Sequence, residues 1–193
     1  MKFQELKKIK RLYFGYEDIS GALGITRASA RVTANRYAEQ GILVRVKRNI
    51  YVLREKWSVL DKEEKFMLAN LIQVPSYISL MTAMEYYGIT TQVQRDFIES
   101  VAVKRSKETA VDGTVFNFSK MDKKLYFAFK RVKGFFIAEP EKAFLDSLYL
   151  MSLKRYGFDM TSIERDKMDA GKLRRTVKKY PQRTQRMLKK WMT

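Results

Sequence analysis

Arg31 and Asn35 carry the groups that most directly suggest chemistry in this sequence, and they stand four residues apart. A guanidinium group bonds bidentately to O6 and N7 of guanine, and a carboxamide bonds to N6 and N7 of adenine. A separation of four residues places both side chains on one face of a helix. The pair is therefore predicted to read base edges in duplex DNA, with about 1–3 kcal/mol of discrimination for each contact.

Residues around this pair carry hydroxyl and cationic groups that suit phosphate oxygens. Such contacts fix the position of a protein on the duplex without reading its sequence. On a helical wheel Arg27 and Arg36 flank the outward face, so we expect phosphate contacts from both. The full set of predicted DNA-binding residues is Thr26, Arg27, Ala28, Ser29, Arg31, Val32, Asn35, Arg36, Arg45, Lys47, Arg48 and Asn49.

A helix-turn-helix motif is predicted to position these side chains. Residues 17–23 form a short helix with acids in its first turn, and Gly24 closes it as a left-handed C-cap. Thr26 then supplies the N-cap oxygen of a second helix over residues 27–40, which Gly41 ends. The inward face of this second helix combines small residues with one aromatic anchor and consists of Ala30, Thr33, Ala34 and Tyr37.

Two further elements complete the expected domain. Apolar residues at helical spacing predict a first helix over residues 1–14. Two β-branched and aromatic runs, residues 42–46 and 50–53, surround a polar turn at residues 47–49 and predict a hairpin. A hairpin directly after a recognition helix is the wing of a winged helix, so residues 1–56 are predicted to form a winged helix-turn-helix DNA-binding domain.

The remaining residues, 57–193, are predicted to form a second, mixed α/β domain. A linker is expected over residues 55–61, and Gly88 ends the second of two helices. The predicted helices cover residues 62–72, 77–87, 139–153, 172–179 and 182–192, and the predicted strands cover 97–104, 115–118, 125–132 and 135–138, with a turn at 121–123. The expected fold class is α+β: a winged helix-turn-helix followed by a domain with a small, mainly antiparallel sheet and C-terminal helices.

The formal net charge of +18 arises at the two ends of the chain. Residues 1–56 hold 13 Lys and Arg against 5 acids, residues 164–193 hold 11 against 3, and residues 57–163 hold 15 against 13. A field of this sign attracts polyanions such as nucleic acid. The basic tail has two interpretations. Its cations face water while Leu173, Val177, Leu188 and Trp191 pack inward, or the cations add phosphate contacts.

The composition excludes most enzyme classes. The chain has neither Cys nor His, which removes thiolate nucleophiles, imidazole metal ligands and the commonest general base. Glu139 and Glu141 suit the first turn of a helix. Asp146 completes this acid cluster, and Asp122 resembles a fragment of a nuclease metal site without an evident partner acid. We therefore expect a protein that is not an enzyme and has no cofactor or metal.

Neither a membrane span nor a leader is expected. The longest apolar stretches fall well short of the roughly 20 residues that a spanning helix needs. The first turns of the chain are rich in lysine and lack the apolar core of a signal peptide. A soluble cytoplasmic protein is the expectation.

Two segments of the second half resemble the AbiEi-type antitoxins of abortive-infection toxin–antitoxin systems. The first runs from Tyr77 to Ile89, and the second from Gly134 to Asp146 with Glu139-Pro140-Glu141 at its centre. The likeness covers about residues 5–155 and departs from many relatives at Tyr87, where they carry His before the glycine. The tail after about Tyr156 does not align with the family.

This resemblance implies an N-terminal winged helix joined to an antitoxin-like α/β domain. It also implies an autorepressor that binds inverted repeats in double-stranded DNA and counteracts a nucleotidyltransferase toxin without forming a stable complex with it. We expect a monomer or a weak dimer on DNA. The alternatives are an adaptor that engages a protein or RNA and whose basic ends are accessory, and a nucleic-acid-processing enzyme.

Overall fold

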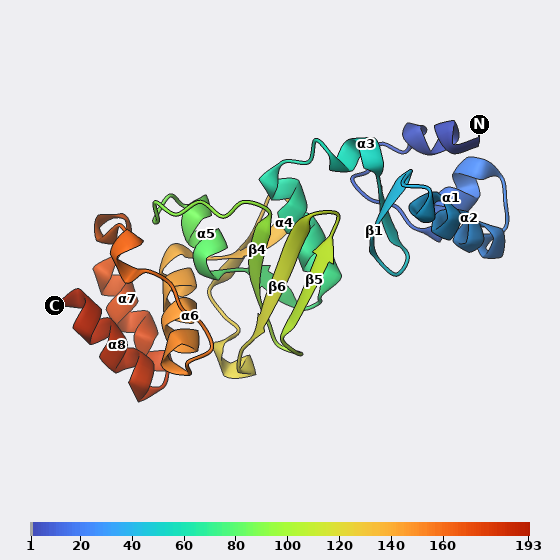
Figure 1. The fold of residues 1–193 in the computed structure, drawn as a ribbon. Helices are drawn as coiled ribbons and strands as arrows, with labels where there is room; N and C mark the ends of the chain where they lie inside the picture. The colour runs from blue at the N-terminus through green and yellow to red at the C-terminus, as the bar shows by residue number, and fades with distance from the viewer. Residues whose placement is uncertain (1) are drawn as a thin grey trace. The chain divides into compact units, whose positions relative to one another are not determined.

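The computed structural model describes residues 2–193 and confirms an α+β fold with two sheets (Figure 1). The chain forms two compact units, the first ending at Leu68 and the second running from Ala69 to Thr193. The division lies within the helix α4 (Lys62–Ile72), beyond the boundary after residue 56 that the sequence suggested. In place of the expected linker, residues 54–57 form a short helix, α3 (Arg54–Trp57), which contacts both strands of the wing.

The first unit begins with a short 3-10 helix rather than the helix predicted over residues 1–14. This element, η1 (Lys2–Lys8), ends well before residue 14, because the chain at Phe14 pairs with Tyr51 of the wing. Phe14 and Tyr51 then form two backbone hydrogen bonds of 3.0 Å. The apolar periodicity of this segment therefore reflects burial of residues such as Leu6 and Phe14, and it does not reflect one continuous helix.

The helix-turn-helix consists of α1 (Tyr16–Leu23) and α2 (Arg27–Glu39), as the sequence predicted. Gly24 has φ +62° and closes α1 in the left-handed conformation that glycine adopts without strain. Ala30 and Ala34 are fully buried and let α2 approach α1 closely. The core of this unit contains Leu6, Phe14, Tyr16, Ile19, Ala30, Ala34, Tyr37, Leu43, Tyr51 and Leu53.

The wing is an antiparallel hairpin of β1 (Leu43–Lys47) and β2 (Ile50–Leu53). Arg45 lies opposite Tyr51 in the register, and a bulge follows between Arg45 and Lys47. Asn49 has φ +60°, a conformation that asparagine tolerates better than most residues. The predicted hairpin is thus confirmed, with its turn one residue shorter than expected.

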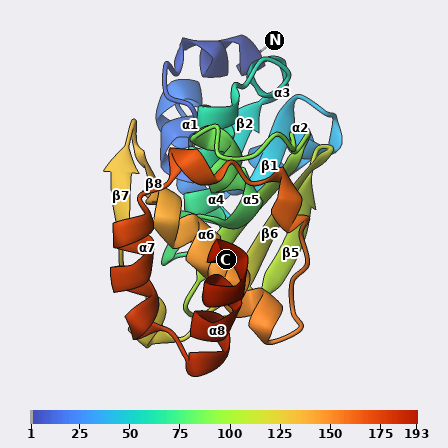
Figure 2. The ribbon, with the colours of Figure 1, turned by 90° about the vertical axis from the view of Figure 1, so that its left-hand side faces the viewer.

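The second unit contains a six-stranded sheet in the order β5-β6-β4-β3-β8-β7. Three of its neighbouring pairs are antiparallel and two, β3 with β8 and β4 with β6, are parallel. β5 and β7 are the edge strands, at opposite sides of the sheet in Figure 2. The strands are β3 (Ser76–Ile78), β4 (Phe97–Ala102), β5 (Lys107–Val111), β6 (Thr114–Lys120), β7 (Phe129–Val132) and β8 (Phe135–Ala138).

The second sheet differs from the sequence-based predictions, and the strand expected over residues 125–132 is the shorter β7. Residues 76–78 form a strand, so the helix expected over 77–87 is the shorter α5 (Leu80–Tyr86). The edge strand β5 was not predicted, because its sequence KETAV is largely polar. The turn at 121–123 does not join a hairpin, because β6 and β7 are not neighbours in the sheet. Asp122 instead caps a 3-10 turn, η2 (Lys123–Leu125).

Helices complete the second unit. α6 (Pro140–Ser152) contacts α5 as well as α7 (Ala170–Thr176) and α8 (Gln182–Met192) (Figure 1). Short 3-10 turns connect them: η3 (Met160–Ser162), η4 (Arg165–Lys167) and η5 (Val177–Lys179). The apolar stripe predicted for the basic tail is confirmed, since Leu173, Val177, Leu188 and Trp191 are all buried. Within residues 2–193, no helix combines the length and apolar character needed to cross a membrane.

Candidate nucleic-acid interface

The outward face of α2 is exposed and basic. Arg31 and Val32 lie at its centre, and the Val32 side chain, 69% exposed, is unusually accessible for an aliphatic residue. The predicted contact residues Arg27, Ala28, Ser29 and Arg36 are also exposed. α2 carries no acidic residue before Glu39. A polyanion that approaches this face therefore meets guanidinium groups. The exposed Val32 side chain suits contact with a thymine methyl group.

Thr26 and Ser29 form the N-cap of α2. Thr26 Oγ1 accepts a hydrogen bond from the Ser29 backbone N–H at 3.2 Å and lies 2.9 Å from Ser29 Oγ. Backbone N–H groups at a helix N-terminus bind phosphate, and the helix dipole favours negative charge there. Both hydroxyls are exposed, so they sit where the sequence-based prediction of phosphate contacts requires.

Arg27 pairs with a carboxylate of α1. Its Nε lies 2.6 Å from Glu17 Oε1, and both side chains are more than half exposed. Backbone hydrogen bonding, together with Asn49 and Arg27, lowers the pKa of Glu17. Exposed pairs of this kind are weak, because water and salt screen the two charges. A phosphate could therefore displace Glu17 from Arg27 at little cost.

Asn49, one of the residues predicted to contact DNA, also hydrogen-bonds within the protein. Asn49 Oδ1 accepts from the Tyr16 backbone N–H at 2.6 Å, and Nδ2 donates to Glu17 Oε2 at 3.4 Å. A Cβ atom at Gly15 would lie only 3.0 Å from both the backbone oxygen and Oδ1 of Asn49. Asn49 therefore fixes the turn of the wing against the start of α1.

Asn35 is half-buried, unlike the other predicted base-reading residue, Arg31. Its Oδ1 accepts a hydrogen bond of 3.3 Å from the hydroxyl of Tyr51, which is itself fully buried. The Tyr51 hydroxyl also lies 3.5 Å from that of Tyr16. Burial raises the pKa of Tyr51 to about 12, while the positive charges of Arg45 and Arg31 act in the opposite direction. The phenol thus stays neutral and connects the wing to the recognition helix.

Sequence reasoning did not identify Tyr51 as part of this interface. The residue was assigned to a strand as one more aromatic side chain, and its partner Asn35 is 16 positions away in the sequence. The register of the hairpin, which places Arg45 opposite Tyr51, is the signal that could have revealed it.

The cationic residues of the wing differ in exposure. Arg45 and Arg48 are exposed, and Lys47 is half-buried.

On α2, Arg36 lies over the ring of Tyr37, with 5.5 Å between its Cζ atom and the ring centroid. This stacking holds the guanidinium group at the flank of the outward face, where the helical wheel placed it.

The acid groups considered for catalysis have structural partners. Glu139 and Glu141 both bind Lys172, with Nζ–Oε2 distances of 2.9 and 2.8 Å. Asp122 Oδ1 accepts from the backbone N–H of Lys124 at 2.8 Å. Asp146 is fully buried and pairs with Lys142 one turn earlier in α6. In the part of the chain that the structure describes, no three acidic side chains gather to hold a metal ion.

Asp146 is the centre of a buried polar network in the second unit. Its oxygens accept hydrogen bonds of 2.8–2.9 Å from the hydroxyls of Tyr77, Ser79 and Tyr180. Lys142 Nζ lies over the rings of Tyr77 and Tyr180, at 5.5 and 5.4 Å from their centroids. Burial raises the pKa values of both tyrosines well above their ordinary value. Because every group has a partner, this network supports the packing of α6.

Comparisons with known proteins bear on the fold. No protein-family model matches the sequence, and a search of curated proteins finds no match. The structure is similar to the crystal structure of the RV2827C protein from Mycobacterium tuberculosis, with a TM-score of 0.59 and 12% sequence identity. The match covers 97% of this chain and 75% of that one. At this identity the likeness concerns the fold alone.

Proposed function

We propose that this protein is a sequence-specific, double-stranded DNA-binding transcriptional regulator. The observation that carries the proposal is the exposed, acid-free face of α2, on which Arg31 and Val32 lie outward while Ala30 and Ala34 are buried. In this proposal α2 enters the major groove, where a helix fits and base edges are distinguishable. The wing, through Arg45, Lys47 and Arg48, lies against the phosphate backbone.

The biological setting we propose follows from the resemblance of residues 77–89 and 134–146 to AbiEi-type antitoxins. The protein would bind inverted repeats in its own promoter as a monomer or weak dimer and repress its operon. It would counteract a nucleotidyltransferase toxin without a stable complex, and it would not itself be an enzyme. We place it in the cytoplasm, where the DNA of a bacterial operon lies.

The test is a binding selection from random duplexes, followed by fluorescence anisotropy with the selected and a scrambled duplex. Specific binding should exceed nonspecific binding by a factor on the order of 10³ or more. Affinity for both duplexes should fall as salt rises, because phosphate contacts release counterions. Equal affinity for selected and scrambled duplexes would contradict sequence-specific recognition. Tighter binding to single-stranded RNA would favour the adaptor function instead.

A further inference from the structure

A groove of about 690 Å³ lies in the second unit, between α8 and the segment that α7 and η5 form. Both helices contact α6, and η5 contacts both of them, so the elements are neighbours in Figure 1. Residues of α8 that line the groove recur every three or four positions, which is the spacing of one helix face. They include Gln182, Gln185, Arg186, Lys189 and Met192.

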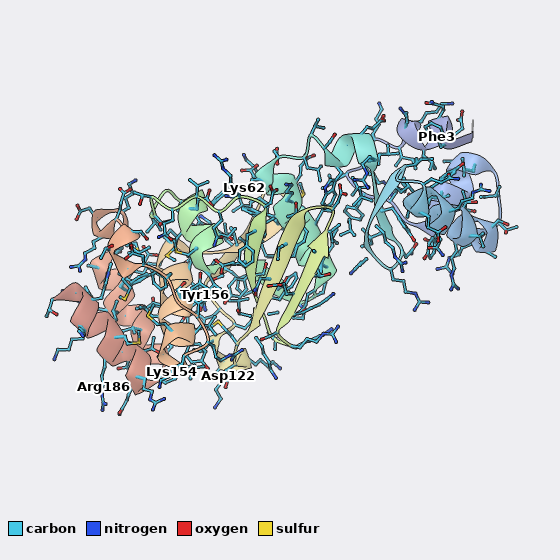
Figure 3. All side chains as sticks on the ribbon, viewed as in Figure 1. Phe3, Lys62, Asp122, Lys154, Tyr156 and Arg186 are labelled. Carbon is cyan, nitrogen blue, oxygen red and sulfur yellow. The ribbon has the colours of Figure 1, made fainter. Side chains whose placement is uncertain are left out.

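Four cationic side chains line this groove, two from each wall. Arg174 and Lys178 belong to the α7–η5 side, while Lys189 and Arg186, which is labelled in Figure 3, belong to α8. All four are exposed, and within the described part of the chain none of them pairs with an acid. Residues 170–193 contain no Asp or Glu. The positive field of the groove is therefore not neutralised by the protein itself, and it favours an anionic partner.

The bottom of the groove is apolar. Val177 and Leu188 line it and are only 8% and 2% exposed, and the half-buried Met192 adds a flexible thioether. Aliphatic groups of this kind contribute by burying apolar surface of a partner, and methionine adapts its shape to what it contacts. A partner that complements both the bottom and the walls carries apolar side chains flanked by carboxylates.

Two other occupants fit these observations less well. Single-stranded nucleic acid is commonly held by aromatic side chains on which its bases stack. Among the described residues that line the groove, none is aromatic. A second copy of this chain would bring its own charge of +18 and would be repelled. The groove thus favours an acidic segment of a different protein.

We propose that this groove binds an acidic amphipathic helix of a partner protein. The apolar face of that helix packs on Val177, Leu188 and Met192, and its carboxylates lie at the cations of the two walls. Docking of an amphipathic helix into a groove uses apolar side chains at positions i, i+3, i+4 and i+7. The 11 residues of α8 extend over about 16 Å, enough for about three turns of such a helix. The surface lies outside the proposed DNA-binding face, and the inference does not depend on DNA binding.

Fluorescence anisotropy of the full chain with a labelled synthetic peptide, in the absence of DNA, tests the proposal. The peptide has about 15 residues, the length at which an isolated helix becomes stable, with leucines at i, i+3, i+4 and i+7 and glutamates at the flanking positions. Saturable binding is expected. A peptide of the same composition in scrambled order should bind at least about tenfold more weakly, because its leucines no longer share one face. Replacement of the glutamates by glutamine should have a similar effect.

Matched double variants of α8 show whether the peptide occupies the groove. Arg186→Glu with Lys189→Glu reverses two charges inside the groove and should weaken peptide binding by at least about tenfold. Arg183→Glu with Lys190→Glu changes the same residue types on the same helix outside the groove, where both side chains are exposed. This control has the same net charge as the first variant and should bind the peptide within about twofold of the native chain.

The opposite wall provides an independent test, through Arg174→Glu with Lys178→Glu. This variant should also lose peptide binding, and it keeps the proposal falsifiable if the α8 variant does not fold, as judged by circular dichroism. Absence of saturable binding, equal affinity for the scrambled peptide, or equal losses in the groove and control variants would overturn the proposal. Tighter binding of a single-stranded oligouridylate, lost only in the groove variants, would assign the groove to RNA and would overturn it as well.

Discussion

The hydroxyl of Tyr51 donates a hydrogen bond of 3.3 Å to Oδ1 of Asn35 and thereby joins the wing to the recognition helix. Tyr51 is fully buried, whereas Asn35 is half-buried at the edge of the outward face. The bond places Oδ1 towards Tyr51 and leaves Nδ2 as the donor that the proposed base contact requires. The orientation of a predicted base-reading side chain is thus set by a residue of the other element.

Tyr51→Phe should reduce sequence discrimination more than stability. Loss of the bond frees the Asn35 carboxamide to rotate, and one hydrogen bond is worth about 1 kcal/mol, or roughly a fivefold change in affinity. We expect this loss for the preferred duplex and little change for a scrambled one, measured by fluorescence anisotropy. Tyr16→Phe removes the other hydroxyl of the pair and is the control, because it leaves the bond to Asn35 in place. Equal effects of the two substitutions would argue against this role of Tyr51.

Arg31→Ala and Arg48→Ala should weaken binding in different ways. Arg31 is on the outward face of α2, so its removal should cost about 1–3 kcal/mol on the preferred duplex and relax specificity at one base pair. Arg48 is in the turn of the wing, so its removal should weaken all duplexes alike and reduce the salt slope by about 1. Anisotropy titrations at several salt concentrations distinguish the two patterns. If both variants lost affinity uniformly, base reading by Arg31 would be wrong.

Asp146→Ala should destabilise the second unit severely. The change leaves the buried Lys142 ammonium and three hydroxyl donors without their acceptor, and breaking a buried pair costs about 3–5 kcal/mol. Glu164→Ala removes an exposed pair with Lys167 and should cost less than about 1 kcal/mol. Urea unfolding followed by Trp191 fluorescence in a Trp57→Phe background reports on this unit. A small effect of Asp146→Ala would mean that the network contributes little to stability.

Glu99 and Glu141 should give opposite pH dependences of stability. Burial raises the pKa of Glu99 above its ordinary value of 4.5, so the stability it contributes is present below that value and is lost as pH rises through the raised pKa. Glu99→Gln removes this dependence, and its free energy of unfolding relative to the native sequence should increase from pH 4.5 towards pH 8. Urea midpoints across this range provide the measurement.

For Glu141, burial acts to raise the pKa but is outweighed by hydrogen bonds from Lys172 and the Asp169 backbone, so the net shift is downward. Its stabilisation is present above 4.5 and is lost as pH falls through the lowered pKa. Glu141→Gln should therefore be less stable than the native sequence at pH 7, and the difference should shrink in acid. The same sign for Glu99→Gln and Glu141→Gln would refute one of the two assignments.

Local signals were sufficient for much of the first unit. Gly24, Thr26 and Gly41 marked helix boundaries that the structure reproduces within about a residue, because caps depend on the conformation of the capping residue itself. The inward positions Ala30, Ala34 and Tyr37 followed from helical periodicity and are buried. The same reasoning failed at residues 9–14, where strand pairing with Tyr51 overrides the apolar pattern.

Local sequence patterns predicted the second unit less well than the first. Residues 76–78 are all buried and lie directly before a helix. A short apolar run of this kind does not show whether the residues form a central strand or the first turn of the helix. β5 is polar because it lies at an edge of the sheet. The hydrogen bonds of the buried Glu99 and Asp146 were not predicted, since the partner residues Tyr77, Tyr156 and Tyr180 come from distant parts of the chain.

The sequence by itself determined the chemistry of the proposed DNA-binding face: which residues are cationic, which helix carries Arg31 and Asn35, and which side of that helix is small enough to pack. The tertiary structure alone decided how those side chains are held. Tyr51 of the wing donates to Asn35, and Asn49 Oδ1 accepts from the first residue of α1. The physical reason is that charge and helical periodicity are properties of neighbouring residues, whereas a hydrogen bond between distant residues exists only once the chain has folded.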